Sequence, residues 1–204
     1  MTLQRTESRL ILASASASRR ALLAGAGLRF DVQPASIDES AVKQSARTDG
    51  LLATDAAIIL ADMKAERVSL RHPEALVIGA DQILVCEDTW YDKPSDPAEA
   101  RRHLRELRGK THVLATAVVC HAAGRSIWQH ETQPRLTMRR FSDTFLDAYL
   151  AAEGDAVTTT VGAYRLEGTG IHLFEKIDGA HDAILGLPLL PLLRFLRDHG
   201  LLIG

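Results

Sequence analysis

The 204-residue chain has few cysteines, the residues that cross-link many small proteins through disulfides or zinc. Its only two cysteines, Cys86 and Cys120, lie in separate apolar runs and form no CxxC pair. This spacing excludes a disulfide framework and a cysteine zinc site, so both thiols are expected to be small buried groups. A reducing, cytoplasmic location is the expectation that follows.

The chain also lacks long hydrophobic runs and a strong net charge. Its first apolar run, 10–13, is too short for a signal peptide or a membrane span. The 24 basic and 26 acidic residues leave a net charge of −2, which excludes a polybasic protein that wraps nucleic acid. We therefore expect neither a membrane nor a nucleic acid as a partner, although a local phosphate site remains compatible with this balance.

Several common catalytic motifs are missing as well. The eight histidines are scattered and form no HxH or HxxxH pair, which argues against a histidine zinc site. Neither a GxSxG nucleophile elbow nor a Walker loop ending in GKS or GKT is present. A hydrolase with a Ser-His-Asp triad stays an alternative, because residue spacing alone does not exclude it.

What remains is the composition of a soluble globular protein. Hydrophobic residues make up 46% of the chain and charged residues 25%, which argues against disorder. A chain of this length buries roughly 70% of its unfolded surface and needs no metal or disulfide to fold. No repeat or low-complexity linker divides the sequence, so one domain over 1–204, which could comprise two closely packed lobes, is expected.

Periodicity and capping signals predict a mixture of strands and helices. The expected strands are 10–13, 30–32, 76–80, 83–86, 113–121, 126–131, 135–140 and 171–177. The expected helices are 19–26, 49–69, 97–107, 143–152 and 188–199, with Asp49, Asp96 and Ser142 as caps. Consecutive strands in the middle of the chain indicate an α/β protein with a mixed sheet and flanking helices.

A turn of small residues follows the first strand and opens into a helix that begins with two arginines. Serine hydroxyls and exposed backbone N–H groups at such a helix start favour an anion. Arg19 and Arg20 are unfavourable at a helix N-terminus unless an anion lies nearby. The alternative interpretation is an ordinary capped helix with two solvated arginines.

Acids and lysines stand at several other loop and strand ends. Asp81 ends an apolar strand next to Gly79, Glu39 follows the second strand, and Lys93 lies in a loop. Lys64 lies in the middle of a helix beside apolar residues. Taken alone, each could be a turn acid or a surface lysine, but the mixture fits a polyphosphate with a divalent metal.

The ordered set of these segments resembles the Maf family of nucleoside triphosphate pyrophosphatases from residue 10 to about residue 202. The segments that carry the resemblance are LILASASASRRALL (10–23), IDES (37–40), ADMKAE (61–66), VIGADQ (77–82), DKP (92–94), GKTH (109–112), LEGTGIHLFEKIDG (166–179) and ILGLPL (184–189). The resemblance implies a mixed α/β fold with a cleft between two lobes, and commonly a homodimer. It also implies hydrolysis of a nucleoside triphosphate to the monophosphate and pyrophosphate with Mg²⁺ or Mn²⁺, as a house-cleaning enzyme. A link to cell-division arrest is attributed to the family too.

The resemblance also implies roles for individual residues. Asp81 would activate water as the proton acceptor, and Asp81 and Glu39 would serve the metal. The residues implied to bind the triphosphate are Ser14, Arg19, Lys64 and Lys93.

Three further positions, Ser18, Gln82 and Glu167, correspond to residues associated with base specificity in the family. Gln82 and Glu167 match the branch that acts on 7-methyl-GTP, whereas Ser18 matches neither that branch nor the dTTP/UTP branch. A carboxylate suits the two adjacent N–H donors of guanine, and an amide suits uracil or thymine better. We therefore expect 7-methyl-GTP or a related nucleotide. The alternatives are a dTTP/UTP pyrophosphatase and a non-catalytic nucleotide-binding regulator of cell division.

Overall fold

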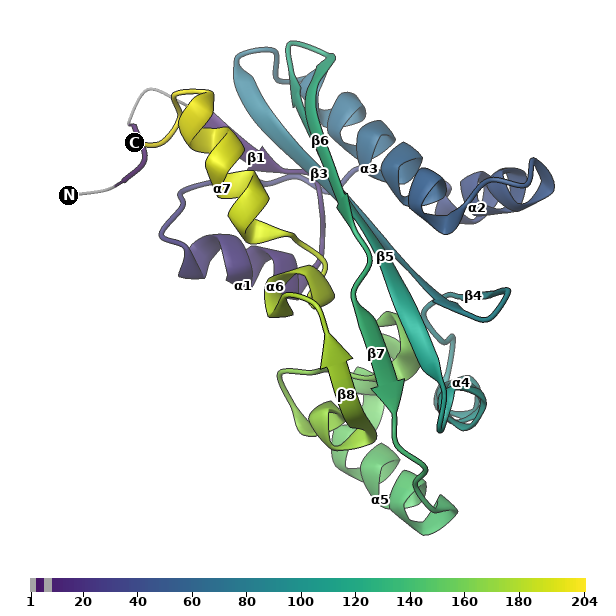
Figure 1. Cartoon of the computed structure of the whole chain (residues 1–204). Coiled ribbons are helices and arrows are strands. Elements are labelled where there is room, and N and C mark those ends of the chain that lie inside the picture. Colours follow the sequence, from purple (N-terminus) through teal and green to yellow (C-terminus); the bar gives the residue numbers. More distant parts are fainter. Residues whose placement is uncertain (1–2, 6–8) are drawn as a thin grey trace. The chain divides into compact units, whose positions relative to one another are not determined.

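The structure, a computed structural model, describes residues 3–5 and 9–204 (Figure 1). These residues fall into two units. The first unit comprises the chain up to residue 82 together with 116–132 and 180–204. The second comprises 83–115 and 133–179. None of the helices in the described residues is long and apolar enough to cross a bilayer. The two cysteines are buried and unpaired, as the sequence predicts.

Parallel and antiparallel strands are combined in the first unit. Its strands are β1 (Arg9–Leu12), β2 (Asp31–Val32), β6 (Arg125–Thr132), and parts of β3 (Ala75–Cys86) and β5 (Thr111–Ala122). Strand β1 pairs in parallel with both β2 and β3, while β5 and β6 form an antiparallel hairpin. The order β2-β1-β3-β5, with β6 beside β5, is the predicted mixed sheet.

Helices cover both faces of this sheet. The helices of the first unit are α1 (Ala17–Gly25), α2 (Glu39–Thr48), α3 (Ala53–Ser69), α6 (His181–Ile184) and α7 (Leu189–Asp198). Leu10 and Leu12 of β1 pack in one apolar cluster with side chains of α1 and α7. Ile11 lies in another cluster with Ala65 and Val68 of α3. Alternate side chains of β1 thus point to opposite helical layers, which explains why the three residues after the exposed Arg9 are all apolar.

The second unit is built from antiparallel pairs and short helical turns. It contains the remaining parts of β3 and β5, with β4 (Thr89–Tyr91), β7 (Arg135–Met138), β8 (Phe174–Asp178), α4 (Pro97–Leu107), α5 (Asp143–Glu153) and 3₁₀ turns at Gly154–Thr158, Val161–Ala163 and Thr169–Leu173. Strand β4 pairs with β3, β7 with β5, and β8 with β7.

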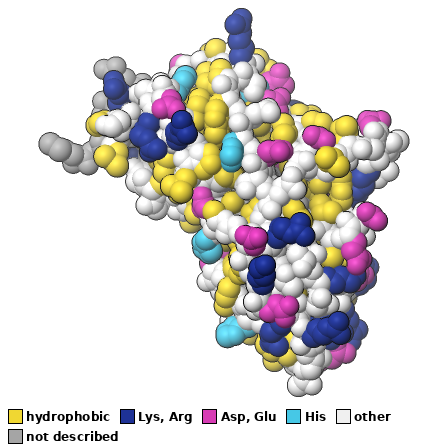
Figure 2. Space-filling model, in the orientation of Figure 1, with side chains coloured by type: hydrophobic (Ala, Val, Ile, Leu, Met, Phe, Trp, Pro, Cys, Tyr) yellow, Lys and Arg dark blue, Asp and Glu magenta, His cyan; other side chains and the backbone are white. Residues whose placement is uncertain are grey.

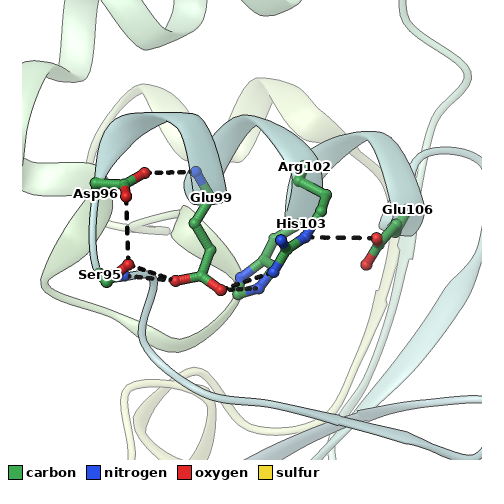
Figure 3. Close-up of polar contacts among 6 residues, drawn as sticks. All are labelled: Ser95, Asp96, Glu99, Arg102, His103 and Glu106. Carbon is green, nitrogen blue, oxygen red and sulfur yellow. Dashed lines mark hydrogen bonds and ion pairs between the residues drawn. The ribbon is translucent and has the colours of Figure 1, made fainter.

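The predicted caps of α4 and α5 are confirmed. The Asp96 carboxylate accepts a hydrogen bond from the backbone N–H of Glu99 at 2.8 Å, and Ser142 Oγ accepts one from Phe145. The Glu99 carboxylate accepts from the N–H and hydroxyl of Ser95, one residue before the cap (Figure 3). Both carboxylates therefore accept hydrogen bonds at the start of α4, but Glu99 bonds Ser95 rather than the N–H of the cap residue Asp96, to which a capping box would join it.

The prediction of one helix over 49–69 is wrong at its start, because α3 begins at Ala53. Helix α2 is a separate element that the sequence analysis missed, and Asp49 caps its C-terminal end rather than the start of α3. The apolar periodicity in α2 is weak because most of its side chains are exposed, so only Asp38, which accepts from the N–H of Ala41, signals its start.

Two strand predictions are also corrected. Residues 76–86 form one continuous strand rather than two, because the polar pair Asp81-Gln82 lies inside β3 without interrupting its hydrogen bonding. The strand predicted from residue 171 begins only at Phe174, after a 3₁₀ turn. At Gly170 an added Cβ would lie 2.3 Å from the Arg165 carbonyl oxygen, so the chain packs too tightly there for an extended strand. The short helix α6 was not predicted either.

The contact between β3 and α3 requires glycine at position 79. A Cβ there would lie 2.1 Å from the Ala61 carbonyl oxygen and 2.9 Å from Ala65 Cβ, whereas a Cβ at Gly25 would meet nothing within 4 Å. Gly79→Ala is expected to lower the free energy of unfolding by about 1–3 kcal/mol or more through overpacking. Gly25→Ala, near the end of α1, should leave it unchanged or raise it. Denaturant unfolding measures both, and a Gly79→Ala protein as stable as the unmodified one would contradict this packing.

Candidate active site

The position of Asp81 follows from the alternation of β3. Val77 packs in the α3 cluster, and Gly79 lies against Ala61 and Ala65 of α3. Since strand side chains alternate, Asp81 points to the same face two residues later. It there meets Lys64, one residue before Ala65 on α3. The sheet and helix periodicities together bring an acid and a base to one buried place.

One ammonium group joins two carboxylates at this place. Lys64 Nζ lies 2.5 Å from Asp81 Oδ1 and 2.6 Å from Glu39 Oε1. Asp81 is 5% exposed and Lys64 7%, whereas the Glu39 side chain is 46% exposed. Glu39 is the first residue of α2, where a helix N-terminus favours a carboxylate. These three side chains carry two negative charges and one positive charge, an arrangement that favours a further cation.

The second oxygen of Asp81 is the unusual atom of the cluster. Asp81 Oδ2 is buried and receives no hydrogen bond from the described residues. A buried carboxylate oxygen without a partner is costly, and its presence in a folded protein calls for an explanation such as a metal ion or a water molecule. Asp81 Oδ2 is therefore suited to bind a group that is not part of the protein chain.

Arg19 lies in the interior rather than in solvent. Its Nε donates to the Gly186 carbonyl at 2.8 Å, and its Nη1 donates to the Ala80 carbonyl at 2.7 Å and to Ser14 Oγ at 3.1 Å. Burial lowers the pKa of the Arg19 guanidinium, while the negative charges of Asp81 and Glu39 oppose this shift. The alternative of two solvated arginines is thus wrong for Arg19 and correct for Arg20, which is exposed.

Gly186 makes the buried position of Arg19 possible. Its φ is +93°, and a Cβ there would lie 3.2 Å from Arg19 Nε. The loop after α6 can therefore approach the guanidinium closely only with glycine at this position. Through Arg19, this loop is tied to the carbonyl of Ala80, the residue that precedes Asp81.

Gln82 is held by groups that the sequence analysis did not single out. Its Nε2 lies 2.7 Å from Thr116 Oγ1 and donates to the carbonyls of Ala183 and Ile184 at 3.1 Å and 3.2 Å. Thr116 is a mid-strand threonine of β5, and no local pattern in the sequence marks it. The segment ILGLPL, which contains Ile184 and Gly186, was noted only as part of the family resemblance.

The remaining predicted site residues are Ser18, Lys93 and Glu167. Ser18 is half-buried in the first turn of α1. Lys93 and Glu167 are exposed and belong to the second unit. The contacts of the first unit therefore bring together Glu39, Lys64 and Asp81, and join Ser14 to Arg19. The roles predicted for Ser18, Lys93 and Glu167 stay predictions.

The donor set can be compared with the needs of a divalent metal. Within 3–5 and 9–204, the structure has no group of three or more histidine, cysteine, aspartate or glutamate side chains arranged to hold a metal. Mg²⁺ is commonly bound by only one or two carboxylates, with phosphate oxygens and water completing its shell. The carboxylates of Asp81 and Glu39, which Lys64 joins, fit that kind of site, because Asp81 Oδ2 receives no hydrogen bond from the described residues.

The surface charge is mixed on the face shown in Figure 2. Basic and acidic side chains are interspersed there rather than gathered into one basic field. On α4, for example, Arg102 lies 2.7 Å from Glu99 (Figure 3), and Arg108, just after this helix, reaches Asp143 at 2.8 Å. This distribution agrees with the near-neutral net charge and with a ligand bound at a local site.

Comparison with known proteins gives the family. The model of the family described as "Maf-like protein" matches residues 9–199. A protein named "Nucleoside triphosphate pyrophosphatase" from Granulibacter bethesdensis is 53% identical, over 94% of this chain and 97% of its own length. Proteins of the same name from Rhodospirillum rubrum and Paramagnetospirillum magneticum are 52% and 51% identical, over 96% and 95% of this chain and 96% and 100% of their own lengths.

Among solved structures, lipoprotein GNA1162 from Neisseria meningitidis matches 75% of this chain and 99% of its own with a TM-score of 0.28 and 12% identity. That similarity is too low to indicate a shared fold. The family match and the curated relatives, in contrast, each span nearly the whole chain. The mixed sheet, the flanking helices and the ordered motifs agree with them: this chain belongs to the Maf family.

Proposed function

We propose that this chain is a nucleoside triphosphate pyrophosphatase in which water attacks the α-phosphorus and pyrophosphate leaves. The observation that carries the proposal is the buried Asp81, which is paired through Oδ1 with Lys64 and has no hydrogen bond from a described residue at Oδ2. Membership of the Maf family and the name shared by relatives about half identical to this chain support the reaction class.

In the proposed mechanism, Asp81 is the base. Its carboxylate takes a proton from the water whose oxygen forms a bond to the α-phosphorus. The bond from that phosphorus to the bridging oxygen breaks, and pyrophosphate leaves with the electron pair. Lys64, 2.5 Å from Oδ1, holds one carboxylate oxygen in place and leaves Oδ2 to receive the proton.

The cationic side chains counter the charge of the triphosphate in this proposal. Lys64 and the buried Arg19 lie close to Asp81, and Ser14 adds a hydroxyl that is fixed by Arg19. Arg19 also holds the Ala80 carbonyl, so it fixes the backbone next to the base. Lys93 is retained as a proposed ligand of the triphosphate on the family resemblance.

A divalent cation, Mg²⁺ or Mn²⁺, is part of the proposal. The carboxylates of Asp81 and Glu39 are the groups that would hold it. When bound, such an ion supplies neutralisation of the phosphate charge that develops during cleavage. Lys64 lies between the two acids and holds them near each other before the ion arrives.

For the substrate we propose 7-methyl-GTP or a related modified nucleotide. Gln82 and Glu167 agree with this choice, and the role would be the removal of unwanted nucleotides in the cytoplasm, by a homodimer. Ser18 departs from the family pattern and lies half-buried in α1. The choice between guanine and pyrimidine nucleotides is therefore the part of the proposal that needs a direct assay.

A nucleotide panel tests the reaction. With Mg²⁺ or Mn²⁺, 7-methyl-GTP is expected to give the monophosphate and pyrophosphate faster than dTTP or UTP does, and a chelator should abolish turnover until metal is restored. Product identification by chromatography provides the measurement. Release of orthophosphate would refute cleavage at the α-phosphorus. Tight nucleotide binding without turnover would point to the non-catalytic alternative.

A single substitution tests whether Asp81 is the catalytic base. Asp81→Asn keeps the side-chain size and removes the proton acceptor, so turnover should fall by roughly two to four orders of magnitude. Asp198→Asn is the matched control, because that carboxylate is exposed on α7 and should leave turnover unchanged. Thermal unfolding confirms that both variants fold. Turnover of a folded Asp81→Asn protein within threefold of the unmodified enzyme would remove Asp81 from this role.

A further inference from the structure

The side-chain amide of Gln82 is fixed by three neighbours of the first unit. Its Nε2 contacts Thr116 Oγ1 at 2.7 Å and the carbonyl oxygens of Ala183 and Ile184 at 3.1 Å and 3.2 Å. Thr116 is fully buried, and its hydroxyl donates to the Ala183 carbonyl at 3.3 Å. The two residues of α6 contribute backbone groups only, so this arrangement does not depend on their side chains.

These neighbours determine the orientation of the Gln82 amide, that is, which of its ends is the NH₂ group and which is the oxygen. A carbonyl oxygen can only accept, so the atom near Ala183 and Ile184 must be the NH₂ group of Gln82. Its two protons and the hydroxyl proton of Thr116 then serve the three acceptors Thr116 Oγ1, Ala183 O and Ile184 O. The opposite orientation would place the amide oxygen against two carbonyl oxygens and lose both of those hydrogen bonds.

As a consequence, Gln82 can offer a ligand only a hydrogen-bond acceptor, its amide oxygen. Its NH₂ donors are engaged by the protein, and its Oε1 receives no hydrogen bond from the residues that the structure describes. A free amide could satisfy both the acceptors and the donor of uracil or thymine. An amide that can only accept suits a base edge with adjacent N–H donors, which guanine has at N1 and N2.

We propose that Thr116 is a positioning residue for base recognition. Together with the carbonyls of Ala183 and Ile184, it holds Gln82 as an acceptor that selects guanine or 7-methylguanine over uracil or thymine. This inference rests on the proposed function, because it takes the nucleotide base to be read at Gln82. It adds a residue of β5 to those that determine specificity.

The first test compares two substitutions of Thr116. Thr116→Val keeps the volume and removes the hydroxyl, so the ratio of kcat/KM for 7-methyl-GTP to that for UTP should fall about 3- to 10-fold, the effect of one buried hydrogen bond. The change should appear mainly in KM. Thr116→Ser retains the hydroxyl and should restore most of the ratio. Thr54→Val removes a hydroxyl from a buried threonine of α3 and should leave the ratio unchanged.

A double-mutant cycle separates positioning from a general structural effect. Gln82→Met removes the amide and should itself abolish most of the preference for 7-methyl-GTP. In that background, Thr116→Val should change the ratio by less than about twofold, because Thr116 would act through an amide that is no longer present. Equal effects of Thr116→Val with and without Gln82 would overturn the inference. The Gln82→Met protein also provides a test if Thr116→Val does not fold.

Binding measurements distinguish a failure of this inference from a failure of the proposed function. Calorimetry with α,β-methylene analogues of GTP and UTP, which resist cleavage, reports base preference without turnover. If the unmodified protein releases no pyrophosphate, the proposed function fails, and the binding preference still tests Thr116. A preference for the guanine analogue that is the same in Thr116→Val and the unmodified protein, or a preference for the uracil analogue in the latter, would contradict the inference.

Discussion

The ion pair between Lys64 and Asp81 is the interaction on which the rest of the candidate site depends. A buried ammonium and a buried carboxylate are stable only together, since removal of either leaves an uncompensated charge in the interior. Lys64 also reaches Glu39, so one side chain of α3 sets the positions of acids on β3 and α2. The close approach of α3 to β3 over Gly79 makes this short bridge possible.

A second set of contacts joins the same strand, β3, to elements that lie both earlier and later in the sequence. Arg19 joins the start of α1 to the Ala80 carbonyl and to the loop at Gly186, while Gln82 is held by α6 and Thr116. Ala80 and Gln82 are thus fixed by hydrogen bonds, which are buried at Ala80 and partly buried at Gln82. Asp81 lies between them, and its buried Oδ2 receives no hydrogen bond from the described residues, an arrangement typical of a preorganised catalytic group.

The sequence predicts the mixed sheet, the capped helices α4 and α5, and the residues that form the charged cluster. It fails where local patterns are weak or where distant groups decide the structure. Helix α2 has too little apolar periodicity to be recognised, and the polar pair Asp81-Gln82 looks like a break in a strand that is continuous. The burial of Arg19 and the role of Thr116 depend on carbonyl groups more than 60 residues away, which no local motif indicates.

The central claim, that water is activated beside Asp81 and attacks the α-phosphorus, has a direct isotopic test. The reaction is run in water enriched in ¹⁸O, and both products are analysed by mass spectrometry. The mechanism predicts one ¹⁸O atom in the nucleoside monophosphate and none in pyrophosphate. Label in pyrophosphate would show attack at the β-phosphorus and would contradict the assignment of Asp81 to the α-phosphorus.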